Sequence, residues 1–325
     1  MANKALVVGI NDYPGCPLTG CVGDAQAMER VLARHDDGSK NFDVILKPNI
    51  RKKGELRKLI RELFNTGEGE IALFYFSGHG CVAGHDGYIV TPDYEEGDEG
   101  ISLAEILKEA NEADGKYKNR VIILDCCNSG KICSASPGSS GAPNIASGVT
   151  LMAACDANEY AMETDRGGDF TSLVVFGMEG AAADICGIVT PSVIYACVDR
   201  FFGSWKQRPV FATNVKTRVV LRKTKPLIEL RTLQKLGEYF EDSDFHELNP
   251  SYEYTNDPKE KHEYTEPYAL KENVKVLKDL QKMERVGLVV PCGEEHMYWA
   301  TMRSKGCELT TAGRYVRDLI LNDRL

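Results

Sequence analysis

The chain has 325 residues, of which 43% are hydrophobic and 27% charged, and its formal net charge is −9. This composition is typical of a globular protein long enough for two domains, and it excludes disordered chains, fibres and coiled-coil rods. The negative charge argues against a nucleic-acid coat, and no run of about 18 uncharged apolar residues predicts a membrane span.

The first two thirds of the chain alternate short apolar runs with amphipathic helical patterns. The expected strands are 4–10, 42–46, 70–76, 120–124, 149–153 and 210–212. The expected helices are 24–34, 54–64, 102–110, 170–182 and 191–202. This alternation predicts the α/β class, with a mostly parallel sheet covered by helices on both faces. In such sheets the active site lies beyond the carboxyl ends of the strands.

Two regions break the alternation. Residues 131–148 form a Gly/Ser/Pro-rich stretch, which is typical of a lid or a cleavage site. After about residue 222, we expect a helix at 272–285, strands at 287–290 and 296–301, and a helix at 310–321. This succession is the outline of a winged-helix module. We therefore predict a first domain at 1–222 and a winged-helix-like module at 223–325.

Reactive side chains follow two strands of the predicted sheet. Ser77-Gly78-His79-Gly80 follows the third strand, and Asp125-Cys126-Cys127-Asn128-Ser129-Gly130 follows the fourth. A histidine and a cysteine at adjacent strand ends can form a dyad, in which the imidazole takes the thiol proton and the thiolate attacks a carbonyl. The glycines can expose amide N–H groups to an oxyanion, an effect of roughly 3–4 kcal/mol per donor. The residues alone do not choose between Cys126 and Cys127, and a structural histidine and core cysteines remain the alternative.

The segments YFSGHG and LDCCNSG resemble those of caspase-like (clan CD) cysteine peptidases, and among them the metacaspases and bacterial caspase homologues, or orthocaspases. The resemblance covers about residues 3–215 and includes ALVVGINDYPG, GCVGDAQAM, AACDANEYAME and GGDFTSLVVFGMEG. It implies a caspase-like three-layer sandwich around a six-stranded sheet. Residues 1–130 then correspond to a large subunit, 149–222 to a small subunit, and 131–148 to the loop between them.

The same resemblance implies a cysteine endopeptidase that needs no cofactor for its chemistry. The family's D-x-C-x-S-G pattern places the nucleophile on Cys127, with His79 as general base and acid. The amides of Gly80 and Cys127 are the expected oxyanion donors. Activation is expected to move the loop or to cleave it at Lys131.

The expected specificity follows from four further positions. In metacaspases a Cys-x-x-Asp, the Ser of SGH and the Asp of DxC form the pocket for a basic P1 residue. Cys21, Asp24, Ser77 and Asp125 fall on these positions, and the QACxG signature of true caspases is absent. The resemblance thus implies protein or peptide substrates cleaved after Arg or Lys rather than after Asp. A helix cap at Asp24 and a turn at Asp125 are the alternative interpretations.

The chain departs from the family's pattern in two places. Asn128 stands where many metacaspases have a histidine after the nucleophile. Asp93 resembles the first acid of calcium-dependent members, but Ser102 and Leu103 replace their adjacent Asp pair, which argues against calcium activation. A zinc site is not expected either, because His79, Cys81 and His85 are close in sequence but no paired second set of ligands lies nearby in the sequence.

The C-terminal module carries a basic stripe on its first expected helix, at Lys271, Lys275, Lys278, Lys282 and Arg285. Interleaved acids favour a solvated face or contact with a regulatory protein over nucleic acid. Tyr298 and Trp299 are expected in the core or as an anchor for a partner. The alternative to a peptidase is an inactive caspase-like scaffold whose module binds a protein or nucleic acid, but retention of both His79 and Cys127 argues against it.

The compartment is inferred from the N-terminus and the cysteines. The N-terminal residues lead directly into a strand, so no secretion signal is expected. The 11 cysteines show no regular framework, which predicts reduced thiols in a cytoplasm. The resemblance leaves open whether the enzyme serves bacterial stress, cell death or defence.

Overall fold

The computed structural model describes residues 3–83, 86–126, 145–154, 163–164, 167–202, 209–257 and 265–325. The chain forms two compact units, Met1–Lys225 and Pro226–Leu325.

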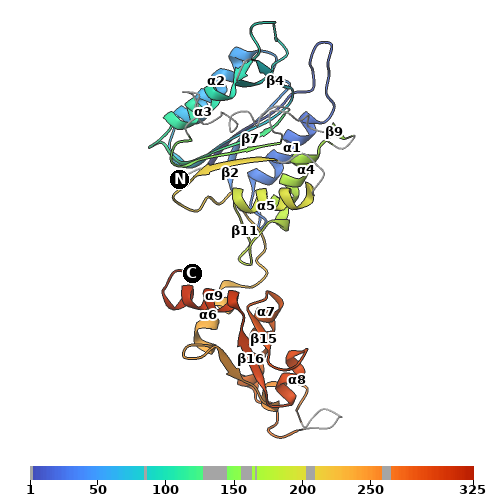
Figure 1. Ribbon diagram of the computed structural model, residues 1–325, viewed down its shortest axis with the longest axis vertical. Helices are drawn as coiled ribbons and strands as arrows, with labels where there is room; N and C mark the ends of the chain where they lie inside the picture. Colours follow the sequence, from blue (N-terminus) through green and yellow to red (C-terminus); the bar gives the residue numbers. More distant parts are fainter. Residues whose placement is uncertain are drawn as a thin grey trace. The chain divides into compact units, whose positions relative to one another are not determined.

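The centre of the first unit is a six-stranded sheet with the strand order β12-β8-β7-β3-β1-β2 (Figure 1). The strands are β1 (Asn3–Gly9), β2 (Phe42–Pro48), β3 (Gly69–Ser77), β7 (Tyr117–Asp125), β8 (Val149–Ala153) and β12 (Val210–Asn214). All neighbours are parallel except β12, which runs antiparallel to β8 at the edge. β3 and β7 are buried along nearly their whole length, as the apolar runs at 71–76 and 121–124 predict. The predicted α/β class and the mostly parallel sheet are confirmed.

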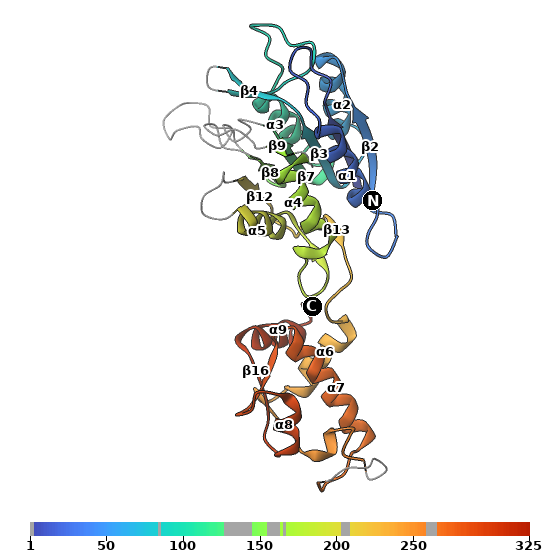
Figure 2. The same ribbon diagram turned by 90° about the vertical axis from the view of Figure 1, so that its right-hand side faces the viewer.

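Helices cover both faces of this sheet (Figures 1 and 2). They are α1 (Cys21–Ala33), α2 (Lys53–Asn65), α3 (Leu103–Glu112), α4 (Asp169–Phe176), the π-helical turn η2 (Gly177–Ala181) and α5 (Pro191–Phe202). Alternate strand residues separate two cores: Leu6 and Phe74 pack with α2 and α3, whereas Val7 and Tyr75 pack with α1, α4 and α5. This alternation places the side chains of the strand ends on defined faces of the sheet.

Short strands form three further sheets within the described part of the first unit. A three-stranded antiparallel sheet contains β4 (Gly80–Ala83), β5 (Asp86–Ile89) and β6 (Ile101–Ser102). Two pairs are formed by β9 (Glu163–Thr164) with β10 (Gly167–Gly168) and by β11 (Ile188–Val189) with β13 (Arg222–Lys223). The β4 strand begins at Gly80, directly after His79. Its pairing with β5 therefore fixes the backbone on the C-terminal side of His79.

The described residues of the second unit form a three-stranded antiparallel sheet in the order β14-β16-β15 and four α-helices. Its elements are α6 (Leu230–Tyr239), β14 (Phe245–Glu247), the 3-10 turn η3 (Pro250–Tyr252), α7 (Lys271–Arg285), β15 (Val289–Pro291), α8 (Met297–Met302), β16 (Gly306–Leu309) and α9 (Thr311–Leu321). The winged-helix assignment stays a prediction.

The strand predicted at 296–301 is wrong. This segment is the helix α8, and the strand that follows β15 in the chain is β16. Met297, Ala300 and Thr301 are its buried residues, a helical spacing, and the Thr301 hydroxyl donates to the Met297 carbonyl at 2.8 Å. Among the described residues of both units, no helix is long and apolar enough to cross a membrane.

Candidate functional site

The site residues after β3 and β7 start from neighbouring strand ends. Ser77 and Asp125 are direct partners in the parallel register of the two strands. The Gly78 amide also donates to the Asp125 carbonyl at 3.3 Å. His79 therefore directly follows a residue that is hydrogen-bonded to the end of β7. The predicted nucleophile Cys127 lies outside the described residues, as do positions 128–131 and His85.

The other cysteine of the pair is a core residue. Cys126 is 3% exposed and packs in the core on the α2 and α3 side of the sheet. A side chain so placed cannot reach a peptide bond in solvent. The burial of Cys126 therefore argues against this residue as the nucleophile, and Cys127 stays the predicted nucleophile.

His79 is held by the loop between β1 and α1. Its Nε2 lies 2.8 Å from the carbonyl oxygen of Cys16. Because a carbonyl only accepts, Nε2 is the donor, and in the neutral ring Nδ1 is then the nitrogen with an available lone pair. This tautomer is the one that can accept a proton at Nδ1.

Tyr13 supports the backbone of the same histidine. The His79 amide donates to the Tyr13 hydroxyl at 3.1 Å, and this hydroxyl donates to the Val90 carbonyl at 3.1 Å. The two rings meet edge to face with their centroids 4.5 Å apart. Burial raises the pKa of Tyr13 well above its ordinary value, so the phenol keeps its proton.

Gly78 makes this contact possible. A Cβ atom at Gly78 would lie 2.5 Å from the Tyr13 hydroxyl oxygen and 2.8 Å from Cζ of Phe76. Gly78 was recognised from the sequence as part of the SGHG motif, whereas Tyr13 was given no role. The sequence feature that pointed to Tyr13 was its place in the ALVVGINDYPG segment.

Two acidic side chains lie on the α1 and α4 side of the sheet. Asp24, in the first turn of α1, is 6% exposed and accepts a hydrogen bond from the Ser77 hydroxyl at 3.3 Å. Asp125, the last residue of β7, is 8% exposed. Both charges raise the pKa of Tyr75, after the larger effect of its burial, so both carboxylates lie near this phenol. Cys21 is buried at the start of the same helix as Asp24.

Thr171 on α4 holds the second of these carboxylates. Its amide and its hydroxyl donate to Oδ2 of Asp125, at 3.2 and 2.6 Å. The hydroxyl oxygen also lies 2.6 Å from the hydroxyl of Tyr75. Thr171 and Tyr75 were given no role from the sequence, although they lie within the quoted segments GGDFTSLVVFGMEG and YFSGHG.

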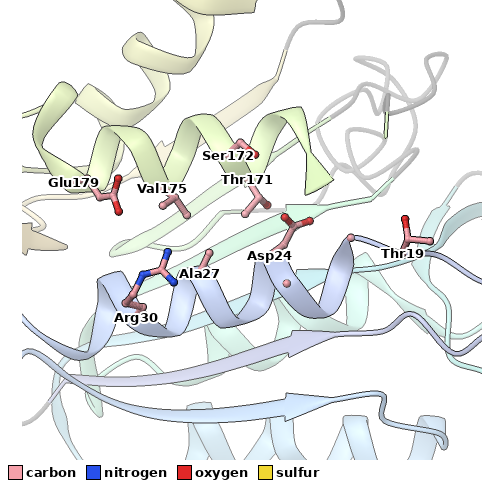
Figure 3. Close-up of a pocket in the computed structure, with 10 residues that line it drawn as sticks. Thr19, Asp24, Ala27, Arg30, Thr171, Ser172, Val175 and Glu179 are labelled. Atoms are coloured by element: carbon pink, nitrogen blue, oxygen red, sulfur yellow. The ribbon is translucent and has the colours of Figure 1, made fainter. Parts of the chain in front are cut away.

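A groove of about 590 Å³ lies between α1 and α4 (Figure 3). Asp24 and Thr171 face each other across the groove, near the N-terminal ends of the two helices. Arg30 and Glu179 lie at its other end. It is lined by Thr19, Gly20, Gly23, Asp24, Ala27, Arg30, Thr171, Ser172, Val175 and Glu179. We call it the α1/α4 groove. It is larger than one amino-acid side chain requires, and a buried carboxylate lies in its wall.

The sequence of this first unit matches a known family. The sequence model of the caspase domain, which defines a cysteine peptidase family, matches residues 2–215. The chain belongs to the caspase domain family. Among solved structures, a protein from Geobacter sulfurreducens shares the fold with a TM-score of 0.50 and 16% identity, over 70% of this chain and 98% of that chain. Caspase-1 from Spodoptera frugiperda gives a TM-score of 0.47 and 12% identity, over 69% of this chain and 91% of that chain. No curated protein matches in sequence.

In this caspase domain, Asp93 acts as a helix cap. Its two carboxylate oxygens accept from the Lys53 amide at the start of α2, at 3.0 and 3.1 Å, and the Thr91 hydroxyl donates to it at 2.6 Å. Ser102 caps α3 through the Glu105 amide, at 3.0 Å. The described residues contain no group of three or more His, Cys, Asp or Glu placed to hold a metal ion. Asp93 and Ser102 therefore each cap a helix, and the expectation on calcium activation stays a prediction.

Outside the caspase domain, acids accompany the basic stripe of α7. Lys275 pairs with Glu272 at 3.0 Å. Lys282 pairs with the buried carboxylate of Asp279 at 3.2 Å, and the Lys278 ammonium lies 5.5 Å from the centroid of a tyrosine ring. Lys275 and Lys282 of this stripe are therefore paired with acids within the second unit.

The aromatic pair of the second unit is on α8 rather than in a ribbon. Tyr298 is 38% exposed and Trp299 is 44% exposed, so neither is a core residue. The Arg303 guanidinium lies 4.8 Å from the centroid of the Trp299 ring. The anchor interpretation of these two residues stays a prediction.

Proposed function

We propose that this protein is a metacaspase-like cysteine endopeptidase that cleaves after Arg or Lys. Its nucleophile is Cys127, and its general base and acid is His79. The observation that carries the proposal is the convergence of Asp24 and Asp125, two largely buried carboxylates, beside Ser77 and next to the histidine loop.

The proposed chemistry begins with the tautomer of His79. Since Nε2 donates its hydrogen bond to the Cys16 carbonyl, Nδ1 is the nitrogen that removes the proton from the Cys127 thiol. The thiolate adds to the carbonyl carbon of the scissile bond, and the oxyanion forms near the amides of Gly80 and Cys127. The imidazolium then protonates the leaving amine, and water hydrolyses the thioester with the same imidazole as base. The burial of Cys126 supports the choice of Cys127.

The proposed selectivity is electrostatic. A guanidinium or ammonium group donates charge-assisted hydrogen bonds to the two aspartates. A P1 aspartate would instead bring a third negative charge into the same buried space. Repulsion between like charges at short distance is several kcal/mol when water is excluded. The pocket geometry therefore favours Arg and Lys over Asp.

A peptide panel tests both parts of the proposal. Peptides that differ only in P1 Arg, Lys, Asp or Ala are incubated with the full chain, and we expect turnover of Arg and Lys peptides at least about 100-fold above the others. Cys127→Ala should abolish turnover. Cys126→Ala is the matched control and should retain it, because that thiol is buried in the core. Preferred cleavage after Asp would reject the pocket, and an active Cys127→Ala variant would reject the dyad.

A further inference from the structure

We propose that Thr171 is a positioning residue of the P1 pocket, which orients the carboxylate of Asp125 toward the substrate cation. The proposal deepens the proposed function and rests on it. Thr171 itself acts through Asp125, which is the residue that would contact the arginine or lysine side chain.

Thr171 and Asp125 are joined by two hydrogen bonds to one oxygen. The Thr171 hydroxyl and amide both donate to Oδ2 of Asp125, at 2.6 and 3.2 Å. Thr171 is 1% exposed and Asp125 is 8% exposed, so these bonds are shielded from water. Hydrogen bonds to an ionised acceptor in such surroundings are short and strong. With Oδ2 fixed at two points, the plane of the carboxylate is also fixed.

Tyr75 completes the hydrogen bonding of the Thr171 hydroxyl, and the donor of each bond can be assigned. The Thr171 hydroxyl has one proton, and the ionised Asp125 can only accept it, so the bond of 2.6 Å between Tyr75 and Thr171 must be donated by the phenol. Burial and the nearby charges of Asp125 and Asp24 raise the pKa of Tyr75, which keeps this donor protonated. Tyr75 on β3 therefore donates to Thr171 on α4, and Thr171 donates to Asp125 on β7.

These hydrogen bonds connect the pocket to the second half of the caspase domain. Asp24, Ser77 and Asp125 all precede the 131–148 loop, whereas Thr171 follows it. Thr171 also lines the α1/α4 groove opposite Asp24 (Figure 3). The position of the Asp125 carboxylate therefore depends on the seating of the first turn of α4. The P1 pocket is complete only when α4 is in place.

Three variants of the full chain test this inference. Thr171→Val keeps the shape of the side chain and the amide donor but removes the hydroxyl, and Thr171→Ser keeps the hydroxyl. Thr150→Val is the matched control: Thr150 is 1% exposed and bonds the Thr213 hydroxyl at 2.8 Å, but it lies on β8 outside the groove. The measurements are KM and kcat for a P1-Arg peptide and the inhibition constant of agmatine, a small guanidinium compound that reports on the pocket without catalysis.

For Thr171→Val we expect KM and the agmatine inhibition constant to rise about tenfold while kcat stays within about twofold. Thr171→Ser should restore both constants to within about threefold of the wild type, and Thr150→Val should leave them unchanged. If Thr171→Val does not fold, Tyr75→Phe carries the test, with an expected rise of about threefold in the same constants.

The outcomes separate the two proposals. Wild-type constants in Thr171→Val, or an equal loss in Thr171→Ser, would overturn the role of Thr171 and leave the proposed function standing. A loss of kcat alone would also overturn it, because a pocket residue should act on binding. Failure of the wild-type enzyme itself to cleave P1-Arg and P1-Lys peptides would instead overturn the proposed function.

Discussion

Removal of the Tyr13 hydroxyl is the sharpest test of how the histidine loop is held. Tyr13→Phe keeps the ring that packs against His79 but deletes one donor and one acceptor. The His79 amide then loses a partner at 3.1 Å, and the Val90 carbonyl loses another at 3.1 Å. Each such bond contributes about 0.5–1.5 kcal/mol net. The free energy of unfolding should therefore fall by about 1–3 kcal/mol.

The same substitution should lower turnover. His79 keeps its ring contact with the Cys16 carbonyl, but its backbone is less well fixed, and catalysis is sensitive to displacements of a fraction of an ångström. We expect kcat for a P1-Arg peptide to fall about tenfold, with KM little changed. The stability loss should be the same at about pH 6 and pH 9, because the raised pKa of Tyr13 keeps the phenol protonated at both.

Urea unfolding followed by circular dichroism measures the first quantity, and steady-state kinetics the second. Tyr94→Phe is the matched control, since this tyrosine is 51% exposed and its hydroxyl has no hydrogen bond with the described residues. It should change neither value. A Tyr13→Phe protein that loses less than about 0.5 kcal/mol and keeps its kcat would refute the assigned role of Tyr13.

Three further substitutions test the packing of the site, the core and the second unit. Gly78→Ala places a Cβ atom 2.5 Å from the Tyr13 hydroxyl, so it should cost about 1–3 kcal/mol and lower kcat; wild-type values in the same two assays would contradict this. Arg120→Met removes a fully buried guanidinium that donates to four backbone carbonyls, and should cost about 3–5 kcal/mol in thermal unfolding. The exposed Lys118→Met is its control, and a loss below about 1 kcal/mol for Arg120→Met would be inconsistent with this role. At Asp279, burial would raise the carboxyl pKa, but hydrogen bonds from two lysines outweigh it and hold the pKa below its ordinary value. This carboxylate stabilises the fold above its ordinary pKa of about 4, and the stability is lost as the pH falls through the lowered pKa. Asp279→Asn should therefore cost about 1–2 kcal/mol at pH 7 and less at about pH 3, whereas a cost independent of pH would disprove the assignment.

The sheet could be predicted because burial on both faces leaves a direct trace in sequence. The predicted strands 70–76 and 120–124 contain the unbroken apolar runs 71–76 and 121–124, and they fall within β3 and β7. The segment 296–301 shows the limit of the method. Six residues with two aromatic side chains fit a short strand as well as a helix, and packing of Met297 and Ala300 into the second unit decided for the helix.

The supporting residues of the site left no comparable trace. Tyr13 and His79 are 66 positions apart, and Thr171 and Asp125 are 46 positions apart. Each partner pair is brought together by the sheet and its covering helices, and one tyrosine or one threonine carries no local pattern. The motif residues were visible because glycines and reactive side chains cluster in a few positions, whereas the residues that orient them are dispersed along the chain.

The strand order explains why these dispersed residues can serve one site. β7, β3 and β1 are consecutive in the sheet, and neighbouring strands lie about 4.8 Å apart, so their three ends span about 10 Å. Asp125 and Ser77 end two of these strands, and Asp24 lies in the first turn of the helix α1, which follows the third. The ends of the strands and the start of α1 therefore bring the three side chains close together. The helix α4 packs across the same face of the sheet as α1 and adds the donor Thr171 to this group.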